Sequence, residues 1–332
     1  MNPRISVILP VRDAALFLEE SLLSLRAQTL ADHEIVAIDD GSTDESPALL
    51  QKFAAGDPRI TVLRRTGDLV AALNAGLRAA RAPLIARMDA DDVAHAERLE
   101  RQARRLDEDA RVDLVGCRVV VDPSAGAGMR AYVEWSNGLL DHDQIVRDLF
   151  VESPLVHPTL MMRASALRAL GGWRAFDGPE DYDLWLRAHA AGLRFGKLGE
   201  PLLLWRDRPG RLTRVDPRYA AARFLALKIE HIERTHLGPG RDAVIWGAGK
   251  IGKSWARALR ARGRSVAGFV EVDPAKIGQR IQGAPVVAVA GAGRFEGALH
   301  LAAVGQPGAR ARIRAEAARL GIRDGRDLLA VA

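Results

Sequence analysis

The sequence predicts an α/β fold in two parts, a doubly wound sheet followed by a smaller α/β unit. Three observations support this prediction. Short apolar runs rich in β-branched residues alternate with segments whose apolar residues recur at helical spacing. The alternation restarts after a Gly/Pro-rich break at 236–242. The 332 residues, 48% of them hydrophobic, are enough for about two domains with buried cores.

Residues 4–122 alternate strand and helix patterns without interruption. Parallel strands need a crossover connection, usually a helix, so this order implies a parallel, doubly wound sheet. Ser42 and Glu45 have the spacing of a capping box, which predicts that a helix begins at Ser42. We predict strands at 4–11, 33–40, 59–65, 82–88 and 112–122, and helices at 15–28, 42–55, 68–80 and 97–109.

The middle of the chain is less regular. Residues 124–132, rich in Gly and Ala, are predicted to form a loop, and 157–170 a strand that runs into a helix. An amphipathic helix is predicted at 180–192, where Gly192 ends it, and a long helix at 218–235.

The Gly/Pro break sets the expected domain limits, 1–237 and 241–332. Beyond the break, strand and helix patterns return in a shorter series. Strands are predicted at 243–249, 265–273, 284–290 and 298–304, with a helix at 250–263.

Composition narrows the class of protein. A single cysteine, Cys117, lies in an apolar run, which excludes an intramolecular disulfide framework and favours a buried thiol in a reducing cytoplasm. The N-terminus lacks the pattern of a signal peptide, and no apolar stretch is long enough to span a membrane. The net charge of +6 fits an anionic ligand, a membrane surface or a simple bias towards arginine. Nucleic acid is not expected as a partner, because the basic residues are scattered without interleaved aromatic residues.

Acidic residues follow two predicted strands directly. Asp39 and Asp40 end the second strand, and Asp89 and Asp91 follow the fourth, in the sequence ARMDADD. Ligands of parallel α/β sheets bind at the carboxyl ends of strands, and carboxylates suit Mg²⁺ or Mn²⁺. The pattern therefore predicts a divalent metal that holds a diphosphate. The alternative is a solvated turn whose last aspartate caps the next helix.

Six motifs in order resemble a family 2 glycosyltransferase of GT-A fold, from about residue 5 to residue 213: SVILPVRD, VAIDDGSTD, LNAGLRAA, ARMDADD with ERLERQ, HPTLMMR and PEDYDLWLRA. The resemblance implies a doubly wound mixed sheet, with a nucleotide-sugar half at about 1–121 and an acceptor half at about 122–237. It implies an inverting, metal-dependent transferase that uses a nucleotide-sugar donor, by default a UDP-sugar. The acceptor would be a glycan or a lipid-linked intermediate, with peripheral contact to the inner face of the cell membrane.

The resemblance also implies roles for residues of the donor site. Pro10 and Val11 would contact the nucleobase, and Asp39, with Asp40, would bind the base or ribose. Asn74 in LNAGLRAA would belong to the substrate site. Asp91, with Asp89, would hold the metal.

On the acceptor side, the resemblance implies that Asp181 is the general base, with Glu180 as the alternative. Asp181 is also predicted to start a helix after a Gly-Pro turn, which would mount it rigidly at a cleft, although acidic residues favour helix starts in any case. His157 is either an acceptor-site or metal-side residue, or a structural histidine braced against Pro158. Where relatives read tyrosine–arginine–any–histidine, this chain has WRDR, so Arg206 and Arg208 could bind a phosphate but a histidine is missing.

A second motif stands between a strand and a helix of the C-terminal unit. Gly247, Gly249 and Gly252 have the G-x-G-x-x-G spacing of a dinucleotide-binding turn, and Glu271 and Asp273 lie where a ribose-binding acid is expected. The region resembles the Rossmann-like module of polysaccharide-biosynthesis enzymes, which would either bind a nucleotide or serve as a packing domain. The alternative function is a nucleotide-sugar oxidoreductase or epimerase centred on this module.

Overall fold

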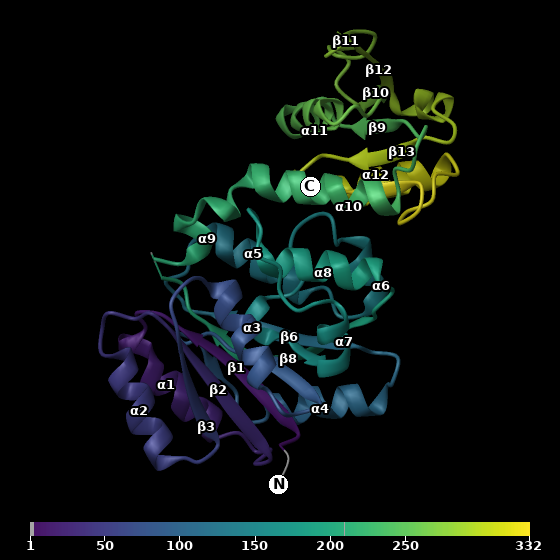
Figure 1. Cartoon of the computed structure of the whole chain (residues 1–332). Helices are drawn as coiled ribbons and strands as arrows, with labels where there is room; N and C mark the ends of the chain where they lie inside the picture. Colours follow the sequence, from purple (N-terminus) through teal and green to yellow (C-terminus); the bar gives the residue numbers. More distant parts are fainter. Residues whose placement is uncertain (1–2, 209) are drawn as a thin grey trace. The chain divides into compact units, whose positions relative to one another are not determined.

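A computed structural model describes residues 3–208 and 210–332, which form two compact units (Figure 1). The first unit comprises Met1–His142 and Pro154–Asp216, and the second comprises Asp143–Ser153 and Pro217–Ala332. The helix α10 (Ala221–Thr235) is therefore part of the second unit.

The first unit is built on a mixed sheet of eight strands in the order β3-β2-β1-β4-β7-β6-β8-β5. Strands β1 to β4 are parallel to their neighbours among themselves, as are β6 and β8, whereas β7 runs antiparallel to both β4 and β6. The sheet is thus mixed and not purely parallel. The strands are β1 (Ile5–Val11), β2 (His33–Asp40), β3 (Ile60–Arg65), β4 (Leu84–Arg87), β5 (Val93–Ala94), β6 (Leu114–Val121), β7 (Met161–Arg163) and β8 (Phe195–Trp205).

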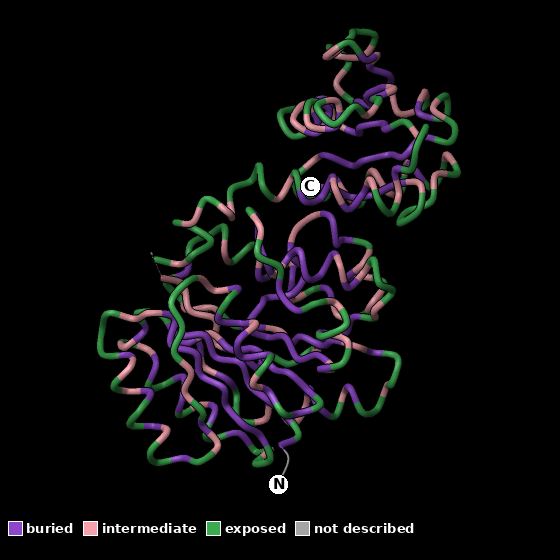
Figure 2. The backbone as a smooth tube through the Cα atoms, viewed as in Figure 1, coloured by how far each residue is buried: buried purple, intermediate pink, exposed green. Residues whose placement is uncertain are grey.

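The burial of β1, β2 and β3 agrees with their places in this order. Every residue of β1 and β2 is buried, as expected for inner strands covered on both faces, whereas β3 at the sheet edge has exposed residues (Figure 2). The helices of this unit are α1 (Ala15–Arg26), α2 (Ser46–Gly56), α3 (Leu69–Ala79), α4 (Arg98–Glu108), α5 (Ala127–Asn137), α7 (Ala164–Ala169), α8 (Glu180–Ala190) and α9 (Leu212–Val215). The short α6 (His142–Arg147) begins at the limit between the units.

The second unit has a six-stranded sheet in the order β11-β12-β10-β9-β13-β14, parallel except for β11. Its core includes Val244, Trp246 and Leu328. The elements are β9 (Ala243–Trp246), α11 (Lys250–Ala261), β10 (Val266–Glu271), β11 (Arg280–Ile281), β12 (Ala284–Ala288), β13 (Leu299–Ala302), α12 (Ala309–Arg319) and β14 (Leu328–Ala330).

Two local predictions were wrong. The helix α2 begins at Ser46 and not at Ser42, because the Asp44 carboxylate accepts a hydrogen bond from the Ser46 N–H at 2.9 Å. The predicted loop at 124–132 contains the start of α5, whose Val133 and Ser136 are buried. Packing of these two residues therefore outweighs the Gly- and Ala-rich start of the segment.

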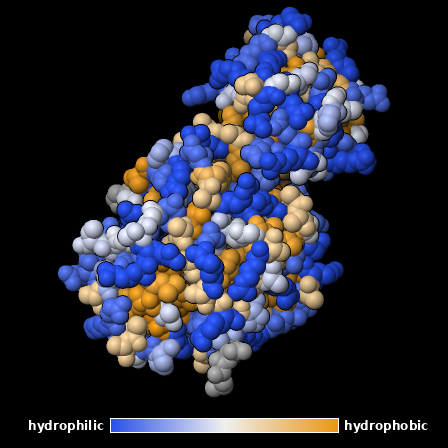
Figure 3. Space-filling view, viewed as in Figure 1, coloured by the Kyte–Doolittle hydropathy of each residue, from blue (hydrophilic) through white to orange (hydrophobic). Residues whose placement is uncertain are grey.

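The surface shown in Figure 3 is mainly hydrophilic, with apolar areas scattered over both units. Among residues 3–208 and 210–332, no helix combines the length and the apolar character needed to cross a bilayer.

Candidate active site

Three carboxylates meet immediately after β4. Oxygen atoms of Asp89, Asp91 and Asp92 lie within 4.8 Å of one another. Asp92 is only 1% exposed, and α4 begins at Arg98 with Glu97 at its cap position. This turn is therefore neither solvated nor a helix cap, which removes the alternative explanation for the acidic motif.

Two buried arginines hold the end of β4 in place. The Arg87 guanidinium contacts Asp89 Oδ1 at 2.6 Å, and Arg87 is 3% exposed. From α4, Arg98 donates to the Arg87 carbonyl at 2.7 Å and to Gln102 Oε1 at 3.1 Å. Two nitrogens of Arg87, Nε and Nη1, lie buried without a hydrogen-bond partner among the described residues. Burying an arginine in this way is costly unless the charges around it compensate.

The three carboxyl groups differ in their tendency to ionise. Burial disfavours the charged form of Asp89, but the positive groups around it, led by the Arg87 guanidinium, together lower the pKa of this carboxyl. Burial, together with repulsion from Asp89, raises the pKa of Asp91. Burial and repulsion from both neighbours raise the pKa of Asp92 well above its usual value. Burial and mutual repulsion thus oppose ionisation of all three carboxyl groups at once.

An arginine-rich segment after β8 lies against this cluster. The Arg206 N–H donates to Asp92 Oδ1 at 3.0 Å, and its guanidinium donates to the Asp91 carbonyl at 2.9 Å. The same guanidinium pairs with Glu20 and lies 5.3 Å from the centre of the Phe17 ring. Arg206 is therefore fixed on several sides.

The next arginines of the segment are held differently. Arg208 Nε lies 2.5 Å from Asp91 Oδ2, although this nitrogen makes no hydrogen bond of acceptable geometry. Arg211 stacks on the Trp205 ring at 4.0 Å. Positive charge from β4 and from the segment after β8 thus surrounds the acidic cluster.

The cluster fits a hard divalent cation. Asp92 Oδ2 is buried and has no hydrogen-bond partner among the described residues, and it belongs to the three-carboxylate group. Carboxylate oxygens are the ligands that Mg²⁺ and Mn²⁺ prefer. A cation bound here would satisfy the orphaned oxygen and balance the charge of the cluster.

A buried chain of polar groups connects the β4 end with the start of α8. The indole Nε1–H of Trp173 donates to His157 Nε2 at 3.0 Å, so a neutral His157 carries its proton on Nδ1. That nitrogen lies 3.6 Å from Glu180 Oε1. Burial, and then the charge of Arg87, lowers the pKa of His157, which favours this neutral form.

The two acidic candidates on α8 occupy different environments. Glu180 is 4% exposed and faces His157, whereas Asp181 is partly exposed and its Oδ1 accepts from the Tyr182 N–H at 2.7 Å. Glu180 also interacts electrostatically with Arg87, as Asp89 does. Arg87 is thus shared between the acidic cluster and the first turn of α8.

The nucleotide-side candidates lie at the ends of β1 and β2. Val11 pairs with Asp39 across the two strands, and both Pro10 and Val11 are buried. Asp39 Oδ1 accepts from the Ser42 N–H at 3.0 Å, and its Oδ2 lies 3.5 Å from Arg64 Nε. Asp39 therefore presents a carboxylate that the chain already orients.

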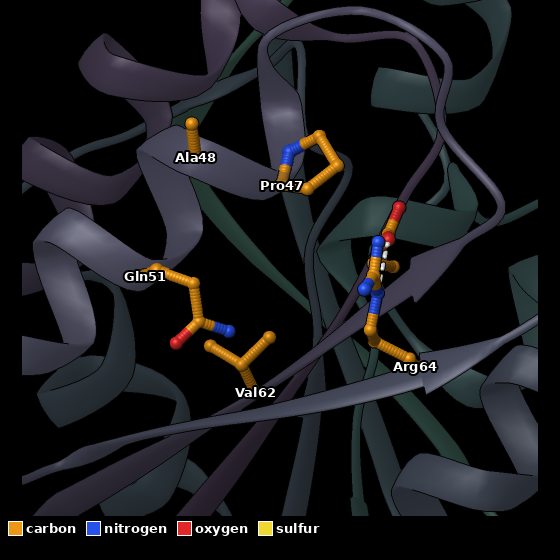
Figure 4. Close-up of a pocket in the computed structure, with 6 residues that line it drawn as sticks. Pro47, Ala48, Gln51, Val62 and Arg64 are labelled. Carbon is orange, nitrogen blue, oxygen red and sulfur yellow. Dashed lines mark hydrogen bonds and ion pairs between the residues drawn. The ribbon is translucent and has the colours of Figure 1, made fainter.

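A hollow of about 210 Å³ opens beside Asp39, between α2 and β3. Figure 4 shows Pro47 and Gln51 of α2 across this hollow from Arg64 of β3. Its lining residues are Asp39, Pro47, Ala48, Gln51, Val62 and Arg64.

Asp40 is the last residue of β2, whereas Asn74 lies on α3. Burial raises the pKa of Asp40, which the Arg12 guanidinium at 3.8 Å partly opposes. Asn74 uses both ends of its amide on Trp173: its Nδ2 donates to the carbonyl at 2.7 Å and its Oδ1 accepts from the N–H at 3.1 Å. Asn74 therefore braces the turn before α8.

The loops after β1 and β2 are tied to each other. Asp13, which has a positive φ of 46°, accepts from the Thr43 N–H at 2.7 Å, and its own N–H donates to Ser42 at 3.1 Å. Asp44 accepts from the Ala15 N–H at 2.9 Å. These bonds fix the two loops, which form a rim beside Asp39.

In the second unit, the glycine motif forms a tight turn before α11. A Cβ on Gly252 would meet the Gly247 carbonyl at 1.9 Å, and Gly249 lies at the cap position of α11. Glu271 Oε2 accepts from the Ala248 N–H at 2.8 Å. Close packing alone thus accounts for Gly252.

Asp273, the other acid expected near the ribose, is partly exposed and pairs with Lys276 at 3.1 Å. The Lys276 side chain lowers the pKa of Asp273, and it also lies 3.6 Å from Glu271 Oε2. Glu271 and Asp273 therefore share Lys276.

Several site residues escaped the sequence analysis: Asp92 as a possible ligand, and the supporting residues Arg87, Trp173 and Arg64. For Arg87 a signal existed, since a charge inside an apolar strand next to three carboxylates calls for a partner. Trp173 and Arg64 carry no such pattern, because their contacts join distant segments.

Comparison with known proteins identifies the chain. The model of the family "Glycosyl transferase family 2" matches residues 6–171, half of the chain. EpsE of Bacillus subtilis, named as a glycosyltransferase, is 32% identical over 213 residues, 62% of this chain and 74% of EpsE. The O-antigen biosynthesis glycosyltransferase WbnJ of Escherichia coli is 30% identical over 206 residues, 61% of this chain and 79% of WbnJ.

The fold has counterparts among solved structures. The crystal structure of S. aureus TarS 1–349 in complex with UDP-GlcNAc superposes with a TM-score of 0.56 at 19% identity. The similarity covers 69% of this chain and 66% of that one, just under two thirds of its length. At this identity the similarity concerns the fold, and it agrees with a GT-A sheet in the first unit.

The chain belongs to glycosyl transferase family 2 and is a transferase enzyme. The oxidoreductase or epimerase alternative is not favoured, because the family match lies in the first unit and the relatives described above are named as glycosyltransferases.

Proposed function

We propose that this chain is an inverting, metal-dependent glycosyltransferase that moves a sugar from a nucleotide-sugar donor to a hydroxyl acceptor. The observation that carries the proposal is the group of three carboxylates after β4, with an orphaned oxygen on Asp92. Asp91 and Asp89 are the proposed metal ligands, and Asp92 adds a third carboxylate to the same group.

A bound Mg²⁺ or Mn²⁺ supplies charge neutralisation for a departing nucleoside diphosphate. The chain's own residues prepare that position. Arg87 keeps Asp89 ionised, and the Arg206 N–H orients Asp92. Arg208 lies close enough to the cluster to meet a diphosphate, for which its planar guanidinium is well suited.

Asp181 is the proposed general base, with Glu180 as the alternative. It would take the proton from the acceptor hydroxyl while that oxygen bonds to the anomeric carbon, and the electron pair of the broken bond leaves with the diphosphate. Attack from the face opposite the leaving group inverts the configuration. The partial exposure of Asp181 supports it over Glu180, which is buried against His157.

The donor is proposed to be a UDP-sugar, whose base or ribose Asp39 would bind with help from Asp40. TarS, named for its complex with UDP-GlcNAc, supports this choice. Pro10 and Val11, both buried at the end of the inner strand β1, are the proposed contacts of the base. A surface polysaccharide or a lipid-linked intermediate is the proposed acceptor, in keeping with the O-antigen role in the name of WbnJ.

The second unit has a proposed supporting role. Residues 241–332 would form a Rossmann-like domain that follows a transferase domain at 1–237 in the sequence. The turn at Gly247, Gly249 and Gly252 would bind a nucleotide, with Glu271 or Asp273 at its ribose. The position of the turn before α11 is compatible with this role. The packing of Gly252 is equally compatible with a purely structural domain.

We place the enzyme in the cytoplasm, at the inner face of the membrane. The net charge of +6 supports contact with anionic lipid, where each basic residue near the surface contributes about 1 kcal/mol. Sedimentation with anionic vesicles at low and high salt tests this placement. A bound fraction that does not fall as salt rises would contradict it.

Thermal melting and transfer assays on the purified full chain test the proposed chemistry. Mn²⁺ with UDP should raise the melting temperature of the unaltered enzyme, because ligands that bind only the folded state stabilise it. Asp91→Asn should lose the Mn²⁺-dependent part of this shift. Asp181→Asn should keep the shift but lose transfer by about 10²-fold or more.

The matched control is Asp32→Asn, an exposed aspartate outside the site. It should behave like the unaltered enzyme in both assays. Full transfer by Asp91→Asn without added metal would refute the proposed metal dependence.

A further inference from the structure

Arg208 makes an unusual contact for a cluster that binds a metal. Its Nε lies 2.5 Å from Asp91 Oδ2, the carboxylate proposed as the main ligand. Both side chains are partly shielded, with 33% of Arg208 and 12% of Asp91 exposed. Nε nevertheless makes no hydrogen bond of acceptable geometry. The contact is therefore an ion pair held by charge and not by a well-formed hydrogen bond.

The other arginines near the cluster are anchored more firmly. Arg206 donates to a main-chain carbonyl and lies over the Phe17 ring. Arg87 is buried beneath Asp89. Among the described residues, the Arg208 guanidinium has one charged partner, the Asp91 carboxylate. Arg208 is thus the arginine that can leave at the lowest cost.

A divalent cation and Arg208 compete for Asp91 Oδ2. Mg²⁺ binds carboxylate oxygen at about 2.0–2.1 Å, and two cations on one oxygen atom repel each other strongly. A released guanidinium has a fork of donors that matches phosphate oxygens. Arg208 can therefore neutralise the charge of Asp91 before the ligands bind and the charge of the diphosphate afterwards.

We infer that Arg208 competes with the divalent cation for Asp91 and moves to the diphosphate when cation and donor bind together. The inference rests on the proposed function and adds a binding order to it. The cation alone binds weakly, because it must displace Arg208. The nucleotide strengthens cation binding by giving Arg208 a new partner.

Calorimetric titration of the full chain with MnCl₂, and with UDP at saturating Mn²⁺, separates the two roles. Arg208→Gln should bind Mn²⁺ alone more tightly, by about fivefold, and bind UDP with Mn²⁺ more weakly by a similar factor. Arg208→Lys keeps the charge but loses the planar fork, so it should bind Mn²⁺ like the unaltered chain and UDP more weakly. Arg111→Gln is the matched control, since Arg111 is exposed and pairs with Asp109 at the end of α4, and it should change neither affinity.

The two levels of the argument fail in different ways. If Arg208→Gln leaves the Mn²⁺ affinity unchanged or lowers it, or leaves UDP binding unchanged, the inference is overturned. The proposed metal site survives that result as long as Asp91→Asn abolishes Mn²⁺ binding. If the unaltered chain binds no Mn²⁺ with or without UDP, the proposed function itself fails.

Discussion

A buried lysine in the first unit should make stability depend on pH. Lys197 on β8 is 7% exposed, and its Nζ donates to the Pro154 carbonyl at 2.8 Å and to Ser136 Oγ at 3.1 Å. Burial lowers the pKa of Lys197 to about 7 from 10.5. We predict that Lys197→Met removes a measurable slope from the curve of unfolding free energy against pH.

The sign follows from proton binding. Between pH 7 and pH 10.5 the unfolded chain carries a proton on Lys197 and the folded chain does not, so stability rises with pH at about 1.4 kcal/mol per unit. From about pH 7.5 to pH 9 this amounts to about 2 kcal/mol. The loss of stability caused by the buried lysine is complete below pH 7 and disappears above pH 10.5.

Cys117 on the neighbouring β6 has the opposite effect at higher pH. Burial raises the pKa of its thiol to about 11 from 9.0, so the unfolded chain loses this proton first and stability falls above pH 9. The two slopes nearly cancel between about pH 9 and pH 10.5. The unaltered chain should therefore gain stability up to pH 9 and then level off.

Urea unfolding at a series of pH values, followed by tryptophan fluorescence, measures these slopes. In Lys197→Met the free energy of unfolding should no longer rise with pH below pH 9. In Cys117→Ala it should continue to rise above pH 9. Parallel curves for the unaltered chain and Lys197→Met would refute the argument, because they would mean that the buried amine titrates as it does in water.

Two further predictions concern packing. Trp173→Phe removes the indole N–H that donates to His157, which leaves a buried nitrogen without a donor. We expect the free energy of unfolding in urea to fall by about 1–3 kcal/mol and transfer to be slower. Full stability would contradict a role for this bond. Gly252→Ala would place a methyl group 1.9 Å from the Gly247 carbonyl, whereas the Cβ added by Gly249→Ala meets nothing within 4 Å. The second unit of Gly252→Ala should therefore melt at a lower temperature than that of Gly249→Ala. Equal melting of the two variants would show that the turn relaxes easily.

Much of the fold was predictable because the hydrophobic pattern of each segment agrees with the helix or strand that it forms. The strand at 33–40 was predicted with its observed limits, since buried inner strands read as continuous apolar runs. The predicted start of α2 was wrong because the helix begins at Ser46, whose N–H donates to the Asp44 carboxylate. Strand β8 was missed because Gly199 and Pro201 interrupt its apolar pattern, and the ladder with β6 indeed shifts register there.

The site was predictable where its chemistry is local. Asp89 and Asp91 are near neighbours in sequence, so their proximity in space needed no tertiary information. The groups that balance them were less accessible: Arg208 reaches Asp91 from a distant segment. His157 and Glu180 also come from separate elements, and their contact depends on how the mixed part of the sheet folds.

The hydrogen bonds between the loops after β1 and β2 bear on how a donor would be recognised. Asp13 and Thr43 hold the two loops together, so little backbone freedom remains to be lost on binding. Affinity at this rim would then depend on the complementarity of the pocket and on desolvation, and hardly on loop ordering. A substitution at Asp13 would weaken binding from outside the pocket, by returning to the loops the freedom that these bonds remove.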